Sequence, residues 1–301
     1  MEINYLYEKN SYKSPLLNIG MATLQSKVSS FPQVFDLQRK LNRDLIVGLI
    51  VMIGIFCLFF YSFKSDQREN FGNGSLNVSF MSKEELKTKL LNEKDSYYQS
   101  FSMYDLEARG AKSIEDYLSK VEKSISDFSD SQKRRLEKLT QDADQRIQKI
   151  QKSWLNGKIL KDLKWKFGLT TGNHYEGGLP HTRDDYIMLS DALLQNDDKY
   201  VTGTLIHEKV HLYQRRYPES VEKYKDEYGM KRWKRKSAND KVRANPDLDD
   251  YIYKTKEGEP MMSIYNENPK GLEDVKTYPQ DGQKNEHPHE RMAIQVEEIV
   301  M

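Results

Sequence analysis

Cysteine is almost missing from this chain of 301 residues. The one cysteine, Cys57, has no second cysteine to pair with, so a fold stapled by internal disulfides is excluded. Cys57 lies inside a long apolar run, where we interpret it as a packing residue rather than a palmitoylation site. The folded part must therefore be stabilised by its core and by any metal that it binds.

An excess of charge of either sign is also missing. The chain has 47 Lys and Arg residues against 46 Asp and Glu residues, for a net charge of +1. This balance gives no electrostatic basis for binding nucleic acid, so we expect no nucleic-acid partner. The basic run at residues 231–236 (KRWKRK) is expected to be the solvated end of a charged helix over 219–236, in preference to a contact with anionic headgroups or nucleic acid.

Long apolar runs are absent except for one, at residues 45–63 (LIVGLIVMIGIFCLFFYSF). As a helix this uncharged run would extend about 28 Å, close to the hydrocarbon thickness of a bilayer. A cleaved signal peptide fits poorly, because the run begins late and no small-residue cleavage site follows it. The sequence therefore predicts a single transmembrane helix in contact with lipid.

The basic residues around this span predict its orientation. Those before it outnumber those after it: Lys27, Arg39, Lys40 and Arg43 precede the span, and Lys64 and Arg68 follow it. By the positive-inside rule, the N-terminus is expected in the cytoplasm and the C-terminal part in a lumen or outside the cell. Glycosylation sequons at 73–75 and 77–79 lie on that same side.

The pattern of the sequence divides the chain into five segments. We expect an N-terminal tail at 1–44, the transmembrane helix at 45–63, a polar linker at 64–80, a helical region at 81–160 and a catalytic domain at 161–301. Apolar residues at heptad spacing follow one another through residues 112–154. Such a seam is typical of a stalk that forms a homo-oligomer or of a helical hairpin packed on its own domain, and we favour the hairpin.

Histidine is absent from the first half of the chain, and all six histidines lie between His174 and His289. Two of them, His207 and His211, form the motif H-E-x-x-H together with Glu208. At this spacing on a helix the two imidazoles share one face and can bind one Zn²⁺, and Glu208 can reach a water beside the metal. The alternative is a chance combination on an exposed helix.

The context of the motif favours the zinc site. Residues 200–217 read as a helix that Pro218 ends, with Asn196, Asp197 and Asp198 as possible N-caps. A short apolar run at 185–190 predicts a strand just before it.

The third zinc ligand must come from elsewhere in the chain. Residues 239–285 read as irregular, and residues 287–300 read as a helix with Pro288 in its first turn. The start of that helix is the densest concentration of possible ligands. The candidates there are Glu286, His287, His289 and Glu290.

His207-Glu208-x-x-His211, followed by a later helix with Glu290-x-x-Ala293, resembles the gluzincin branch of the zinc metallopeptidases. The resemblance implies a zincin-like α+β domain, predominantly helical and with a small sheet, in which Glu290 is the third ligand and Ala293 lets two helices approach. It also implies that the strand before the motif holds extended peptide by edge pairing. The distance in sequence from His211 to Glu290 is longer than in the best-known gluzincins. The whole chain resembles membrane-anchored metallopeptidase-like proteins of large DNA viruses, which adds a virion as a location.

The expected function is that of a membrane-anchored zinc metallopeptidase acting on a protein or peptide. Glu208 would act as general base, and the oxyanion donor would be His181, His289, Tyr213 or Tyr265. His181 fits equally well as a structural loop residue. Two alternatives stay open: a structural or interaction protein of a membrane-bearing particle with little or no activity, and a zinc hydrolase acting on another amide or ester.

Overall fold

The structure is a computed structural model that describes residues 77–91, 97–237, 240–280 and 286–301. The predicted tail, the predicted transmembrane helix and nearly all of the predicted linker lie outside the described residues. Within the described ranges, no helix is long and apolar enough to cross a membrane. Residues 74–301 form one compact unit.

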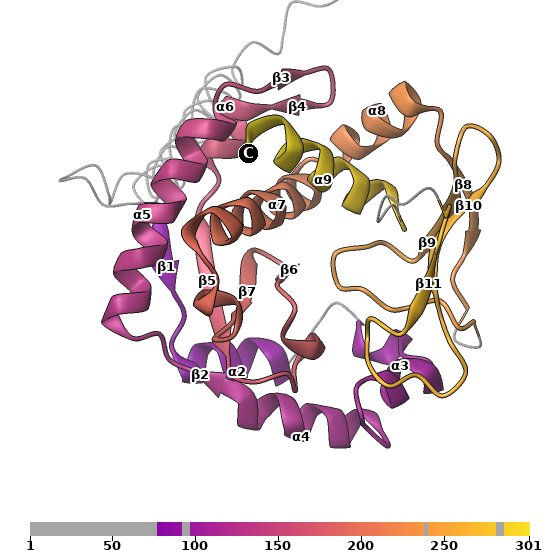
Figure 1. The fold of residues 1–301 in the computed structure, drawn as a ribbon, viewed down its shortest axis with the longest axis horizontal. Helices are drawn as coiled ribbons and strands as arrows, with labels where there is room; N and C mark the ends of the chain where they lie inside the picture. Colours follow the sequence, from indigo (N-terminus) through magenta and orange to yellow (C-terminus); the bar gives the residue numbers. More distant parts are fainter. Residues whose placement is uncertain (1–76, 92–96, 238–239, 281–285) are drawn as a thin grey trace, which may run out of the picture. The chain divides into compact units, whose positions relative to one another are not determined.

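A mixed sheet packs against the motif helix (Figure 1). Its strand order is β1, β5, β7, β6, and β2 pairs with β5 beside this path. The strands are β1 (Val78–Phe80), β2 (Ile125–Ser126), β5 (Trp165–Thr170), β6 (His181–Arg183) and β7 (Tyr186–Ser190). β1, β5 and β7 run parallel, whereas β6 is antiparallel to β7. The strand predicted over 185–190 is therefore confirmed as β7, but it lies inside the sheet, and β6 forms the edge.

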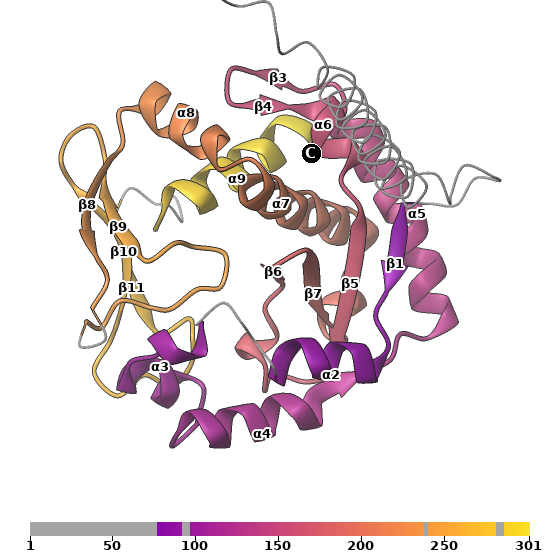
Figure 2. The ribbon, with the colours of Figure 1, turned by 180° about the vertical axis from the view of Figure 1, so that it is seen from behind.

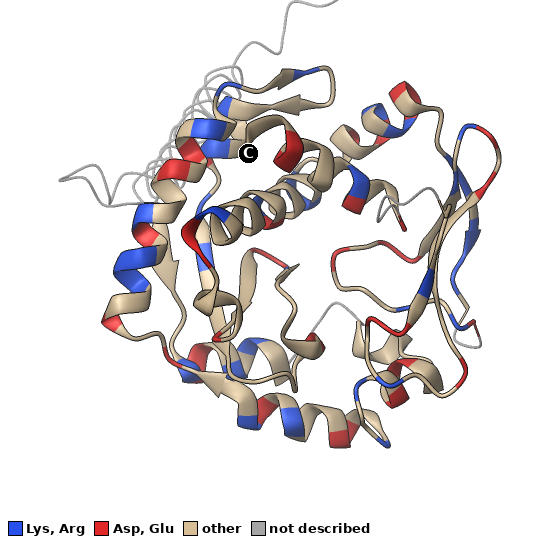
Figure 3. Ribbon diagram, viewed as in Figure 1, with Lys and Arg blue, Asp and Glu red and all other residues tan. Residues whose placement is uncertain are grey.

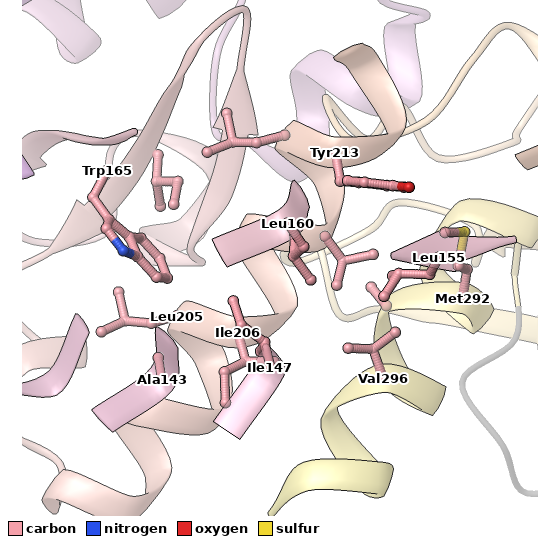
Figure 4. Packing of buried hydrophobic residues seen from close by; sticks show 14 of the residues in the cluster. Ala143, Ile147, Leu155, Leu160, Trp165, Leu205, Ile206, Tyr213, Met292 and Val296 are labelled. Atoms are coloured by element: carbon pink, nitrogen blue, oxygen red, sulfur yellow. The ribbon is translucent and has the colours of Figure 1, made fainter. Parts of the chain in front are cut away.

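Three helices carry the site. They are α5 (Asp130–Ile147), α7 (Asp198–Arg216) and α9 (Pro288–Val300). α7 and α5 contact this sheet, and α9 packs on α7. α7 packs between α5 and α9 (Figure 1). Figure 4 shows how side chains from all three helices, among them Ile147, Ile206 and Val296, meet in one apolar core. The helix predicted for the motif is confirmed, and its N-cap is Asp197, which accepts a hydrogen bond of 2.8 Å from the amide of Tyr200.

The predicted seam over residues 112–154 is divided between two helices, which pack on this domain as the favoured alternative expected. The region contains α4 (Ile114–Ser124) and α5, each beginning after a serine cap, Ser113 or Ser129. Apolar residues of α4 and of α5 pack into two different core clusters of the same unit. The side chains of the seam are thus used by this domain's own core, although the two helices join separate clusters rather than one hairpin.

Contacts within the fold cross the predicted boundaries at 80 and 160. β1, taken from the predicted linker, pairs with β5, and α5 packs on α7. The remaining short elements join these layers: α2 (Lys83–Leu91), α3 (Met103–Ala108), α6 (Gly157–Asp162), the β3 (Gln151–Lys152) and β4 (Leu155–Asn156) hairpin, and 3₁₀ turns at Tyr98–Ser100, Glu176–Gly178 and Leu193–Gln195.

A second sheet replaces the irregular region predicted for 239–285. It is antiparallel, in the order β11, β10, β9, β8, and Figure 2 shows it beside the first sheet and α7. Its strands are β8 (Lys231–Arg235), β9 (Tyr251–Lys254), β10 (Pro260–Tyr265) and β11 (Val275–Tyr278). The helix predicted to reach residue 236 is α8 (Pro218–Tyr228), which ends at Gly229 in the left-handed conformation (φ 69°). The α+β class is confirmed, and charges of both signs spread over the outer helices α4 and α5 (Figure 3).

Candidate metal centre

The motif residues lie in the middle of α7, where the helix is buried on most sides. Leu205, Ile206 and Val210 are fully buried, and they fix the helix against α5 and α9. His207 and His211 are one turn apart and therefore project from the same face. The His207 side chain keeps 17% of its exposure and the His211 side chain 1%.

Glu290, in the first turn of α9, meets these two histidines. Its Oε2 lies 3.2 Å from Nε2 of His207, and its Oε1 lies 3.8 Å from Nε2 of His211. The two Nε2 atoms are 3.1 Å apart. Ligand atoms bound 2.0–2.1 Å from a tetrahedral zinc lie about 3.3 Å from one another. Two imidazole nitrogens and a carboxylate oxygen, all within 4.8 Å of one another, could therefore hold one metal ion.

The other ring nitrogens of the histidines have polar partners of their own. Nδ1 of His211 lies 2.8 Å from the amide oxygen of Gln214, so it donates its proton there. Nδ1 of His207 lies 3.6 Å from Oε2 of Glu297. With its proton on Nδ1, His211 turns the lone pair of its Nε2 to the position that it shares with Nε2 of His207 and the carboxylate of Glu290. Lone pairs gathered in this way are stable when a cation lies between them.

The electrostatics of the cluster also favour a cation. Burial lowers the pKa of His211 to about 3, so this ring stays neutral and free to bind a metal. Burial alone would raise the pKa of Glu290, but the hydrogen bond with His207 and the nearby imidazoles hold it well below its ordinary value. Burial opposes protonation of His207 too, yet the carboxylates of Glu290 and Glu297 raise its pKa well above 6.5. The position between the carboxylates thus attracts positive charge.

Gly203, one turn before His207, makes room for Glu297. A Cβ atom at residue 203 would lie 2.7 Å from Oε1 of Glu297. Gly203→Ala should displace this carboxylate from His207 and weaken zinc binding by about 10- to 100-fold, although alanine favours the helix itself. Zinc affinity can be measured by competition with a chelator. Gly271→Ala is the control, because its Cβ would meet nothing within 4 Å, and equal affinities for the two variants would contradict the role of Glu297.

Glu208 is held at the metal cluster by the edge strand β6. Oγ1 of Thr182 donates to Oε2 of Glu208 and to its carbonyl oxygen, each at 3.0 Å. Burial, and then the nearby carboxylate of Asp247, raise the pKa of Glu208 well above 4.5. Glu208, His211 and Asp247 could also group around an ion. We favour the first group, because two histidines point into it and Thr182 already holds both Glu208 and Asp247.

The backbone amide and carbonyl of Thr182, on the outer edge of β6, already have hydrogen-bond partners. Its amide donates to Oδ1 of Asp247 at 2.7 Å, and its carbonyl accepts from Nη2 of Arg215 at 3.0 Å. The prediction that the strand before the motif holds peptide along its edge is wrong for β7, which is internal. At Thr182 of β6, side chains of this chain already satisfy the backbone.

The four predicted oxyanion donors lie at different places in the structure. Only His181 lines the pocket that contains Glu208 and Glu290. His289 instead contacts the carbonyl of Asp247 through Nδ1 at 3.0 Å. The other two candidates lie elsewhere: the hydroxyl of Tyr213 accepts from the amide of Asn156, and that of Tyr265 accepts from Arg109.

The alternative third ligands also have other partners. Glu286 accepts from Arg243 at 2.6 Å, and Nε2 of His287 lies 3.1 Å from Asp249. Glu290 alone among the four candidates joins the two motif histidines. Asn245, which the sequence did not suggest, donates to Oε1 of Glu290 at 3.0 Å and holds it in place.

A pocket of about 380 Å³ opens over this cluster. It is bounded by α7, α9, the segment before β6 and the second sheet. Its volume is within the range of small-ligand and active-site clefts. One side of the metal position therefore faces a space that can admit a substrate group.

The comparisons with known proteins add no relative. No protein-family model matches the chain, and neither the curated proteins nor the solved structures contain a match. The functional interpretation consequently rests on the residues and their geometry.

Proposed function

We propose that this chain is a zinc-dependent metallopeptidase in which His207, His211 and Glu290 bind the metal. One observation carries the proposal: two imidazole nitrogens from α7 and the carboxylate of Glu290 from α9 lie within 4.8 Å of one another, with Glu208 beside them. The proposal includes a membrane anchor at residues 45–63, with the catalytic domain in a lumen, outside the cell or on a virion.

The chemistry follows from the residues around the cluster. When bound, zinc supplies a Lewis acid that acidifies water, polarises a carbonyl group and offsets the clustered negative charge. Glu208 accepts the proton of the attacking water and passes it to the leaving amine. Thr182 holds Oε2 of Glu208, so we assign this proton transfer to Oε1. The raised pKa of Glu208 suits a group that must both accept and release a proton.

His181 is the one predicted oxyanion donor that lines the pocket over the metal cluster. Its Nδ1 donates to the carbonyl of Leu179 at 3.0 Å, and its Nε2 is buried without a hydrogen-bond partner among the described residues. In the neutral ring Nε2 carries no proton, so His181 can donate from Nε2 only in its protonated form. Burial lowers its pKa more than the carboxylates of Glu176 and Asp247 raise it, so the neutral ring is favoured. Its Nε2 is then an acceptor, which argues against His181 as the oxyanion donor.

A structural or interaction protein that keeps the metal but has little activity is the second candidate. The observation that favours it is the edge of β6, where Asp247 and Arg215 occupy the backbone groups of Thr182. In this case zinc would stabilise the fold and no peptide would be cleaved. The pocket over the cluster favours the peptidase.

Metal analysis of the full-length protein tests the proposal. We expect about one zinc per chain in the wild type and a loss of that zinc in His207→Ala, because two remaining ligands bind zinc weakly. Incubation with a peptide library should give cleavage products that disappear with His207→Ala or a chelator. His174→Ala is the matched control, because His174 is exposed. Equal zinc content in wild type and His207→Ala would contradict the ligand assignment, and zinc binding without cleavage would favour the structural alternative.

A further inference from the structure

The cleft over the metal cluster continues into a second groove. Leu179, Pro180 and Tyr200 line the pocket above the metal and also line a neighbouring groove of about 430 Å³. These three residues form the common border of the two spaces. A chain that enters the catalytic pocket can therefore continue past Tyr200 into the groove.

Two large apolar side chains are exposed at this border. Leu179 retains 41% of its exposure and Tyr200 57%. Six large hydrophobic residues are this exposed in the part of the chain that the structure describes, and two of the six meet here. Scattered exposed apolar residues need no explanation, but a pair at the mouth of a cleft is typical of a binding site.

The groove differs from the catalytic pocket in charge. The catalytic pocket contains the carboxylates of Glu208, Asp247, Glu290 and Glu297. None of the residues that line the groove is charged, although 31% of the chain is. An uncharged lining gives a charged side chain no partner and therefore favours an apolar one.

Glycines keep the groove open. Gly178 has a φ of +77°, and a Cβ there would lie 3.0 Å from the carbonyl oxygen of Gly172. Its own carbonyl accepts a hydrogen bond of 2.7 Å from Oγ of Ser190. The wall of the groove thus has a fixed backbone with little side-chain bulk.

The position of Tyr200 relates the groove to the reacting bond. Tyr200 and His207 are two turns apart on one face of α7, which corresponds to about 10 Å along the helix. An extended peptide covers that length with about three residues. A side chain in the groove would therefore be about three residues from the scissile bond.

We propose that this groove is a substrate subsite, which accepts an uncharged apolar side chain of an extended peptide about three residues from the bond that is cleaved. Leu179 and Tyr200 determine the preference. The inference rests on the peptidase function proposed above and adds the class of substrate to it.

The test uses the full-length protein with bound zinc. Cleavage of a mixed peptide library, with products identified by mass spectrometry, gives the preferred residue at each position around the cleaved bond. One cleaved peptide is then made in three versions, with Leu, Gly or Lys at the third position on either side of the cleaved bond. We expect Leu to be preferred on one side, and Tyr200→Ala to lower kcat/KM for the Leu peptide by about tenfold while changing the Gly peptide less than about twofold. Leu179→Asp should shift the preference towards Lys.

The matched control is Ile159→Ala, which removes an apolar side chain of similar exposure (39%) from α6. It should leave all three peptides unchanged. Cleavage with no preference at these positions, or an equal effect of Tyr200→Ala on the Leu and Gly peptides, would overturn the subsite and leave the peptidase function intact. Absence of cleavage by the zinc-loaded wild type would overturn both.

Discussion

Glu208→Gln is expected to lower peptide hydrolysis by about 1,000-fold while the protein keeps its zinc. The amide has nearly the shape of the carboxylate, so it can still accept the hydrogen bond from Thr182. It cannot take a proton from water, which removes the general base. Because Glu208 is not one of the three ligands, the metal content should equal that of the wild type. The measurement is kcat/KM on the best library peptide, together with zinc per chain.

Glu219→Gln provides the same chemical change outside the site. Glu219 is exposed at the start of α8, so this variant should be as active as the wild type. Two results would contradict the role of Glu208. One is turnover by Glu208→Gln close to the wild-type rate, and the other is loss of zinc, which would make Glu208 a ligand in place of the base.

Arg109→Leu should have the largest effect on stability. Arg109 is almost completely buried, and it holds Glu176 through two hydrogen bonds, Nε to Oε1 at 3.1 Å and Nη2 to Oε2 at 2.6 Å. The same guanidinium donates to Tyr265 in the second sheet and to the carbonyl of Ala244. Removal of the cation leaves the Glu176 carboxylate buried and unpaired. The free energy of unfolding should fall by about 3–5 kcal/mol, measured by urea denaturation.

Two further variants separate charge from packing in this prediction. Arg109→Leu combined with Glu176→Gln should recover part of the lost stability, because residue 176 then no longer carries an isolated buried charge. Arg235→Leu breaks an exposed ion pair with Asp250 (71% and 53% exposed side chains), and it should change stability by less than about 1 kcal/mol. If Arg109→Leu were no more destabilising than Arg235→Leu, the hydrogen bonds from Arg109 to Glu176, Tyr265 and Ala244 would not stabilise the fold as proposed.

Local signals predicted the elements that carry the site, and tertiary packing decided the rest. The motif helix had an N-cap candidate in Asp197 and a stop in Pro218, which report on the local backbone alone. The seam over 112–154 left a stalk and packing on the chain's own domain both open, because apolar residues at helical spacing are the same whether they face a second chain or the chain's own core. In β10, Ser263 is buried between the buried Met261 and Tyr265, so the alternation of apolar residues that marks a strand is interrupted.

In the candidate site too, some residues could be predicted from the local sequence, and others depend on tertiary packing. Glu290 could be predicted because it begins a helix with a small residue, Ala293, in the next turn. Glu297 could also have been found, since it lies seven residues after Glu290 and hence on the same helix face. Asn245 and Asp247 could not, because they belong to a segment between β8 and β9 without periodicity. Their approach to the metal cluster depends on the path of that segment across β6.

The most direct test of the metal centre is anomalous diffraction at the zinc edge from crystals of the zinc-loaded protein. One anomalous peak is expected about 2.0–2.2 Å from Nε2 of His207, Nε2 of His211 and a carboxylate oxygen of Glu290. The peak should be absent in His207→Ala. A fully occupied zinc at another position, with these three side chains uncoordinated, would contradict the central claim.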